Sequence, residues 1–150
     1  MKWREKLEKE GLPRIEKITG KMSKKWGEGT MVIPSPKEVD EIMKKVPRGK
    51  LITINEIREF LARKHNTDIA CSLTTGLFVV ISARAAEEAA EENKDITPYW
   101  RTLKTGGILN DKYPGGAERQ KKMLEEEGHK IIKKGKKYVV QDYEKYLVNL

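Results

Sequence analysis

The residues best suited to chemistry stand in three short motifs in the second half of this 150-residue chain. Thr-Pro-Tyr-Trp-Arg occupies 97–101, Tyr-Pro-Gly-Gly occupies 113–116 and Glu-Gly-His occupies 127–129. Together they offer a phenol, an indole, a guanidinium, a carboxylate and an imidazole. A phenol with a pKa of about 10 is mostly un-ionised at neutral pH, so Tyr99 is a poor nucleophile.

The single cysteine and the two histidines set further limits on chemistry. Cys71 has no partner for an intrachain disulfide, and these counts argue against a structural zinc site. Beside Ile69 and Leu73 on a predicted helix, Cys71 is expected to behave as a small hydrophobe rather than as a displaced nucleophile. No adjacent base or metal-binding cluster accompanies the 97–101 motif. An enzyme of unrelated chemistry is therefore the least favoured interpretation, and we expect no metal and no cofactor.

In order and nearly in spacing, the three motifs resemble the DNA-binding half of the alkylguanine-DNA alkyltransferases, the methylated-DNA–protein cysteine methyltransferase family. The resemblance extends over roughly residues 35–132. That family places its nucleophilic cysteine within Pro-Cys-His-Arg, where this sequence has Tyr99 for the cysteine and Trp100 for the histidine. The resemblance implies an alkyltransferase-like member that lacks the catalytic cysteine and is not an enzyme.

The resemblance also shows which base-handling residues are missing. Residues 46–53 look like the family's entry to its helix-turn-helix, and residues 72–76 fall where its recognition helix carries an Arg-Ala-Val-Gly-Gly type segment. In the family an arginine enters the base stack and a tyrosine helps to rotate the nucleotide outward. Ser72 and Ile54 stand at these positions here, and a short serine cannot offset the few kcal/mol that base flipping costs. An Ala/Glu-rich insertion before Pro98 leaves the register around Ser72 open.

Two sets of site residues follow from the resemblance. The expected ligand pocket consists of Tyr99, Trp100, Arg101, Tyr113 and Glu127. The expected DNA contacts are Arg48, Lys50, Ser72, Thr74, Thr75, Gly76, Gly115 and Gly116. Small residues allow a helix to approach a groove closely, and glycine amides at a helix N-terminus could hold a phosphate. The aromatic pair at 99–100 either accepts a base or small ligand or fills the former active site. For Glu127 we favour a structural role, with bonds to backbone groups or Arg101.

The order of helical and extended patterns predicts an α+β fold, and together with the resemblance it implies a winged helix-turn-helix domain with a basic N-terminal extension. Helix-start signals stand at 35–38 and 53–56. A third helix is expected from Thr67 or Asp68 to about residue 92, a fourth over 117–127 and a short last one after Asp142, with hairpins over 102–109 and 131–140. We place the extension at 1–30, with a short amphipathic helix and a Trp26 that tucks against the main body, and the alkyltransferase-like winged-helix domain at 31–150.

The net charge of +8 favours contact with a polyanion, although composition alone does not separate DNA from an acidic protein. The resemblance implies binding of duplex DNA, alkylated DNA included, and a role in DNA repair as a damage reader. The alternative is a degenerate alkyltransferase-like domain that serves as a protein-interaction module, because the third helix is largely apolar and an acidic run covers 87–95. No apolar run is long enough to span a membrane and no signal-peptide core is present, so a cytoplasmic monomer is expected.

Overall fold

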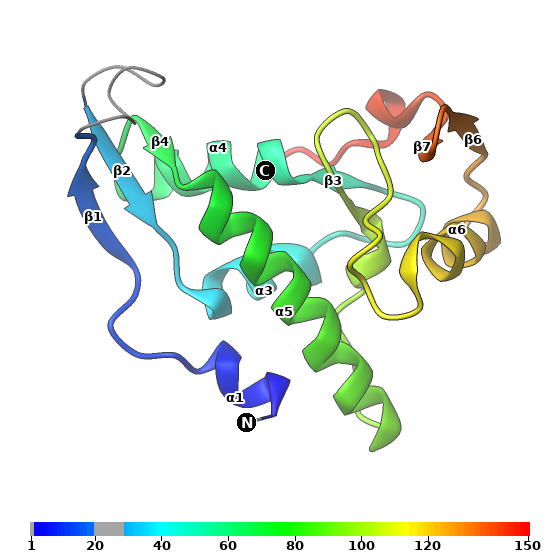
Figure 1. Ribbon diagram of the computed structural model, residues 1–150, viewed down its shortest axis with the longest axis horizontal. Coiled ribbons are helices and arrows are strands. Elements are labelled where there is room, and N and C mark those ends of the chain that lie inside the picture. The colour runs from blue at the N-terminus through cyan, green and yellow to red at the C-terminus, as the bar shows by residue number, and fades with distance from the viewer. Residues whose placement is uncertain (1, 20–28) are drawn as a thin grey trace.

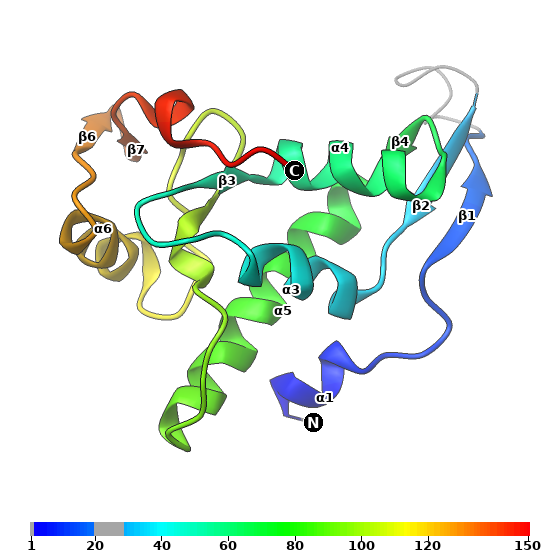
Figure 2. The same cartoon turned by 180° about the vertical axis from the view of Figure 1, so that it is seen from behind.

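The computed structural model describes residues 2–19 and 29–150 as a mixed α+β fold, which confirms the α+β part of the predicted fold (Figures 1 and 2). The elements are, in chain order, α1 (Trp3–Leu7), β1 (Arg14–Lys17), β2 (Thr30–Ile33), α3 (Pro36–Lys44), β3 (Ile52–Thr53), α4 (Ile54–His65), β4 (Ile69–Ala70), α5 (Ser72–Glu91), the 3-10 turn η1 (Tyr99–Arg101), β5 (Thr102–Leu103), α6 (Gly116–Glu126), β6 (Ile131–Lys134), β7 (Lys137–Val140) and η2 (Tyr143–Tyr146).

The long helix α5 organises the fold. It runs diagonally across the front of Figure 1, with α3 and α4 behind it, and α1, α3, α4 and η1 all pack against it. Its buried face repeats at helical spacing through Thr75, Phe78, Val79 and Ser82. Three small sheets surround the helices: β1-β2-β4, the parallel pair β3-β5 and the antiparallel hairpin β6-β7.

Both predicted capping boxes are present. The Ser35 hydroxyl accepts the amide of Glu38 at 3.2 Å, and the Glu38 carboxylate accepts the amide of Ser35 at 2.8 Å. Glu56 likewise accepts the Thr53 amide at 2.9 Å. These reciprocal bonds satisfy amides that the first turn of a helix leaves unpaired. They fix the starts of α3 and α4 at the predicted positions.

The third helix begins later than expected and buries a different face. Residues 69–70 extend as β4 beside β2, and Asp68 accepts the Thr30 amide at 2.8 Å, so α5 begins only at Ser72. The apolar spacing of Leu73 and Leu77 predicts that both lie on one buried face of this helix, but they are 82% and 55% exposed. The helix therefore turns its apolar pair outward at its first two turns.

Three other segments differ from the sequence pattern. The expected hairpin over 102–109 is reduced to one antiparallel bridge between Lys104 and Ile108, because residues 102–103 pair in parallel with β3 instead. The expected last helix is the short 3-10 turn η2. In the N-terminal region α1 packs on α5 and β1 pairs with β2, whereas Trp26 lies outside the described residues. Within the described ranges, no helix has the length and apolarity to cross a membrane.

Candidate functional site

Tyr99, which stands where the resemblance puts the acceptor cysteine, is packed inside the protein. It is 1% exposed, and its ring stacks on Tyr113 with centroids 5.2 Å apart and planes 4° apart. Trp100 contacts the Tyr99 ring by its edge at 5.4 Å. Burial, together with a 2.7 Å hydrogen bond from the Tyr99 hydroxyl to Glu87, raises the pKa of Tyr99 far above that of a free phenol. The aromatic pair fills this volume rather than lining an open pocket.

Glu127 is the hydrogen-bonding centre of the cluster. Its carboxylate accepts the Arg101 Nε–H at 2.9 Å, the Trp100 indole N–H at 2.6 Å and the Gly49 amide at 3.0 Å. Burial alone would raise the pKa of Glu127, but the bonds from Arg101, Gly49 and Trp100 outweigh it and hold the pKa below its ordinary value. Glu127 therefore bonds both the arginine and a backbone group, as its structural interpretation requires.

Arg101 extends this cluster to the loop that joins α3 to β3. Its Nη1 donates to the Val46 carbonyl at 2.8 Å, and Arg48 in the same loop donates to the Glu126 carbonyl at 3.0 Å. The Arg101 and Glu127 side chains are 13% and 3% exposed, so the ion pair is largely removed from water. The pair ties the loop, η1 and the end of α6 into one rigid unit.

Tyr113 completes the expected pocket from the opposite side. It is 3% exposed, and its hydroxyl donates to the Thr102 carbonyl at 2.9 Å. Gln120 bonds the Trp100 carbonyl at 3.0 Å and accepts the Asn110 amide at 2.7 Å. The structure thus brings all five expected pocket residues together, but as a packed cluster with little exposed ring surface.

Two residues of this cluster escaped the sequence analysis. Glu87 accepts the Tyr99 hydroxyl, and Gln120 fastens the backbone beneath Trp100. Glu87 belongs to an Ala/Glu-rich tract that is typical of a solvated helix, and Gln120 lies in a helix rich in charged residues. The sequence around Glu87 or Gln120 does not indicate a role in the cluster, because the residue that each of them bonds lies on another element.

The expected DNA contacts on α5 differ in their exposure to solvent. Ser72 is exposed and Thr74 and Gly76 are half-buried at the start of the helix. Thr75 is fully buried, and its hydroxyl donates to the Cys71 carbonyl at 2.7 Å. Thr75 lies on the same buried helical face as Phe78 and Val79, so in this conformation its side chain cannot contact a DNA groove.

The remaining expected DNA contacts lie elsewhere on the molecule. Arg48 and Lys50 are exposed on the loop between α3 and β3, which lies beside α6 and far from the start of α5 in both views (Figures 1 and 2). Gly115 is the left-handed N-cap of α6, with φ of 78°, and Gly116 is the first residue of that helix. The predicted set is therefore split between separate surfaces.

The other candidate groups are placed as follows. Cys71 is the half-buried N-cap residue of α5, and its sulfur accepts the Thr74 hydroxyl at 2.9 Å. Among the described residues, no group of three His, Cys, Asp or Glu side chains could hold a metal ion. His129 is 5% exposed, packs by its edge against Tyr146 at 4.8 Å, and has no hydrogen-bond partner on either ring nitrogen within the described ranges.

The fold matches two solved structures. The first is S. pombe Atl1 in complex with damaged DNA containing O6-carboxymethylguanine, with a TM-score of 0.56 and 21% identity, covering 77% of this chain and 94% of that chain. The second is S. pombe ATL in complex with DNA, with a TM-score of 0.52, 22% identity and the same coverage. No protein-family model and no curated protein sequence matches the chain significantly. The resemblance read from the motifs is thus confirmed by a structural match, which at this identity shows the fold.

Proposed function

We propose that this chain is a non-catalytic, alkyltransferase-like DNA-binding protein that reads damage in duplex DNA. The observation that carries the proposal is the cluster around Tyr99. Residues of three separate motifs meet there, as the resemblance to the family implies, in a fold shared with proteins crystallised on DNA. The position that the resemblance assigns to the acceptor cysteine holds a buried phenol.

The environment of Tyr99 argues against alkyl transfer. A nucleophile must present an unshared electron pair to the alkyl carbon, within reach of a base that takes its proton. Tyr99 is 1% exposed, and its hydroxyl donates a hydrogen bond to Glu87. Trp100 stands where the family has its base, and its indole nitrogen can only donate.

The winged helix-turn-helix remains our interpretation of how this fold meets DNA. In that interpretation α4 and α5 are the paired helices, and the exposed start of α5 enters a groove through Ser72, Thr74 and Gly76. The β6-β7 hairpin is the wing, and its exposed tip carries Lys133, Lys134, Lys136 and Lys137. Lysines at a hairpin tip can neutralise phosphates without reading bases.

Fluorescence anisotropy with labelled duplexes tests the proposal. Matched duplexes with guanine, O6-methylguanine or O6-carboxymethylguanine at one position are titrated at two salt concentrations. We expect tighter binding to the alkylated duplexes and a steep loss of affinity with salt, because phosphate contacts release counterions. Negligible binding to all three duplexes at low salt would refute DNA binding. Equal binding to all three would refute only damage reading.

A second candidate function is a protein-interaction module that no longer binds DNA. The observation that favours it is the exposure of Leu73 and Leu77, one turn apart, on the helix that would enter the groove. Exposed leucines at this spacing are typical of a helix face that binds another protein. The same titration separates the two functions, because this candidate predicts no measurable affinity for any duplex.

A further inference from the structure

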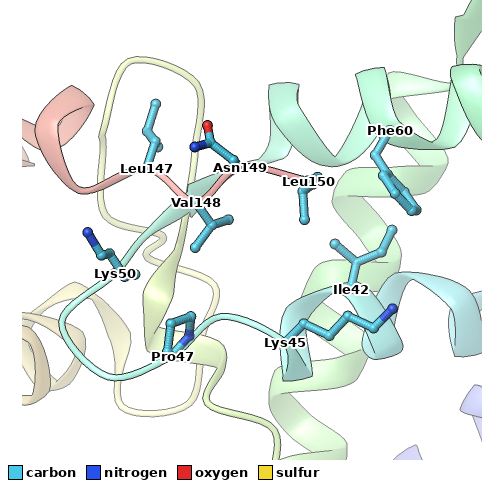
Figure 3. Close-up of a pocket in the computed structure, with 9 residues that line it drawn as sticks. All are labelled: Ile42, Lys45, Pro47, Lys50, Phe60, Leu147, Val148, Asn149 and Leu150. Carbon is cyan, nitrogen blue, oxygen red and sulfur yellow. The ribbon is translucent and has the colours of Figure 1, made fainter.

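A groove of about 520 Å³ lies between α3, α4 and the C-terminal segment (Figure 3). It is on the face turned to the viewer in Figure 2, whereas α5 lies in front in Figure 1. Its lining consists of Ile42, Lys45, Pro47, Lys50, Phe60, Leu147, Val148, Asn149 and Leu150. None of the lining residues belongs to the cluster around Tyr99, so the groove is separate from that cluster, although Lys50 is also one of the expected DNA contacts.

The C-terminal segment forms one wall of the groove and is held by the backbone of one residue. The Leu51 amide donates to the Tyr146 carbonyl at 2.9 Å, and the Val148 amide donates to the Leu51 carbonyl at 3.0 Å. This parallel pairing fixes the segment in an extended form. In Figure 3 the side chains of Val148 and Leu150 point toward Ile42, so the interior of the groove is apolar.

All the charged side chains that line the groove are cationic. Lys45 and Lys50 flank the apolar interior, and its lining contains no aspartate or glutamate. Neither lysine forms an ion pair with any residue in the part of the chain that the structure describes. An occupant that combines an apolar side chain with neighbouring carboxylates would satisfy both features at once.

We infer that this groove binds a short acidic segment of a partner protein, with a bulky apolar residue of that segment seated between Ile42, Phe60 and Val148. A hollow of this volume suits one or two large side chains, and lysines at the rim would pair with flanking acids. A DNA duplex fits less well, because an apolar interior gives phosphates and base edges no partners. The inference does not rest on DNA binding, since the groove lies on the face opposite α5.

To test the inference, three capped hexapeptides are titrated into the ¹⁵N-labelled full chain, and the amide signals of the chain are monitored by NMR. The first is Asp-Asp-Leu-Phe-Asp-Asp, the second replaces its aspartates by lysine, and the third replaces its leucine and phenylalanine by serine. We expect the first peptide alone to shift the amides of Ile42, Lys45, Phe60 and Val148. Lys45→Glu should weaken its apparent affinity about threefold, and Lys45→Glu combined with Lys50→Glu about tenfold.

The matched control is Lys122→Glu combined with Lys130→Glu, which changes the net charge equally at exposed lysines on and after α6. It should leave peptide binding within twofold of the wild type. Equal weakening by both double variants would show nonspecific charge attraction and overturn the inference. Amide shifts that map outside the groove, or no shifts at millimolar peptide, would also overturn the inference. Shifts of groove amides on raising the protein concentration alone would overturn it too, because a second copy of the chain would then occupy the groove. The DNA titration is run separately, so either proposal can fail alone.

Discussion

The hydroxyl of Tyr99 donates to Oε1 of Glu87 at 2.7 Å, and the same oxygen lies 3.1 Å from the guanidinium of Arg119. Three elements, η1, α5 and α6, therefore meet at one carboxylate. Glu87 belongs to the Ala/Glu-rich tract between Gly76 and Pro98, which the family resemblance treats as an insertion. This tract thus supplies the group that fixes the phenol of Tyr99, the residue that the resemblance aligns with the family's cysteine.

Two substitutions separate the packing of the Tyr99 ring from the hydrogen bond of its hydroxyl. Tyr99→Phe keeps the stack on Tyr113 and loses the bond to Glu87, so the free energy of unfolding should fall by about 1 kcal/mol. Tyr99→Cys also leaves a cavity and should cost about 3–4 kcal/mol. Urea denaturation followed by tryptophan fluorescence measures both variants. Equal losses would contradict a packed ring.

The same cysteine variant also tests whether the missing thiol is the only barrier to alkyl transfer. Tyr99→Cys restores sulfur, but Trp100 cannot accept its proton and Glu127 is already paired with Arg101. We expect no gain in intact mass after incubation with a duplex containing O6-methylguanine. The double variant Tyr99→Cys with Trp100→His is measured beside the single variant, because it also introduces a side chain that can accept the proton of the thiol. A methyl group found on the introduced thiol of the single variant would contradict this prediction.

Removing the Glu127 charge should destabilise the fold strongly. Glu127→Gln leaves the Arg101 guanidinium, 13% exposed, without its carboxylate, and breaking a buried pair in this way costs about 3 kcal/mol. Glu126→Gln, one residue earlier and exposed, should change the free energy of unfolding by less than about 0.5 kcal/mol. Urea titrations at neutral pH compare the two.

Acid should reduce the difference in unfolding free energy between the wild type and Glu127→Gln. The pKa of Glu127 in the folded chain lies below the ordinary value of 4.5. Its contribution is therefore present above that value and is lost as the pH falls through the folded pKa. The difference between the two unfolding free energies should shrink as the pH falls from about 5 to about 3. A constant difference over this range would show that the pair does not lower the pKa.

Much of the helical framework could be predicted from the sequence, because its signals are local. Ser35 with Glu38 and Thr53 with Glu56 satisfy amides within one turn, so α3 and α4 begin where the pattern places them. The start of α5 depends instead on pairing between β4 and β2, which are far apart in sequence. Apolar spacing alone could not show that Leu73 points outward, since the same spacing describes a buried stripe.

The sequence motifs predict that the site residues cluster, but not whether the cluster is open or filled. The motifs bring Tyr99, Arg101, Tyr113 and Glu127 together, as their resemblance to the family implies. Whether the cluster is open or filled depends on Glu87, which approaches from another element. The expected DNA contacts mix exposed and buried positions, because small residues such as Thr75 suit a helix–groove contact and a helix–core contact equally well.

His129 should cause a measurable loss of stability at mildly acid pH. Burial lowers its pKa below the ordinary 6.5, so the unfolded chain takes up a proton first and stability falls as the pH drops below that value. His129→Phe keeps the edge contact with Tyr146, removes two unpaired nitrogens and should flatten the loss between about pH 7 and pH 5.5. At pH 7 it should be neutral or stabilising by up to about 1 kcal/mol. If the wild type does not lose stability over this pH range, the assignment to His129 is wrong.

The tip of the β6-β7 hairpin should set the salt dependence of DNA binding if it acts as a wing. Lys136→Gln combined with Lys137→Gln removes two exposed cations from that tip, and the slope of log affinity against log salt should fall by about 1–2 in magnitude. Lys9→Gln combined with Lys45→Gln removes the same charge elsewhere and should change the slope by much less. Anisotropy titrations at four salt concentrations give each slope. Equal slopes for the two double variants would mean that the hairpin contributes only to net charge, and the wing would have to be sought in another element.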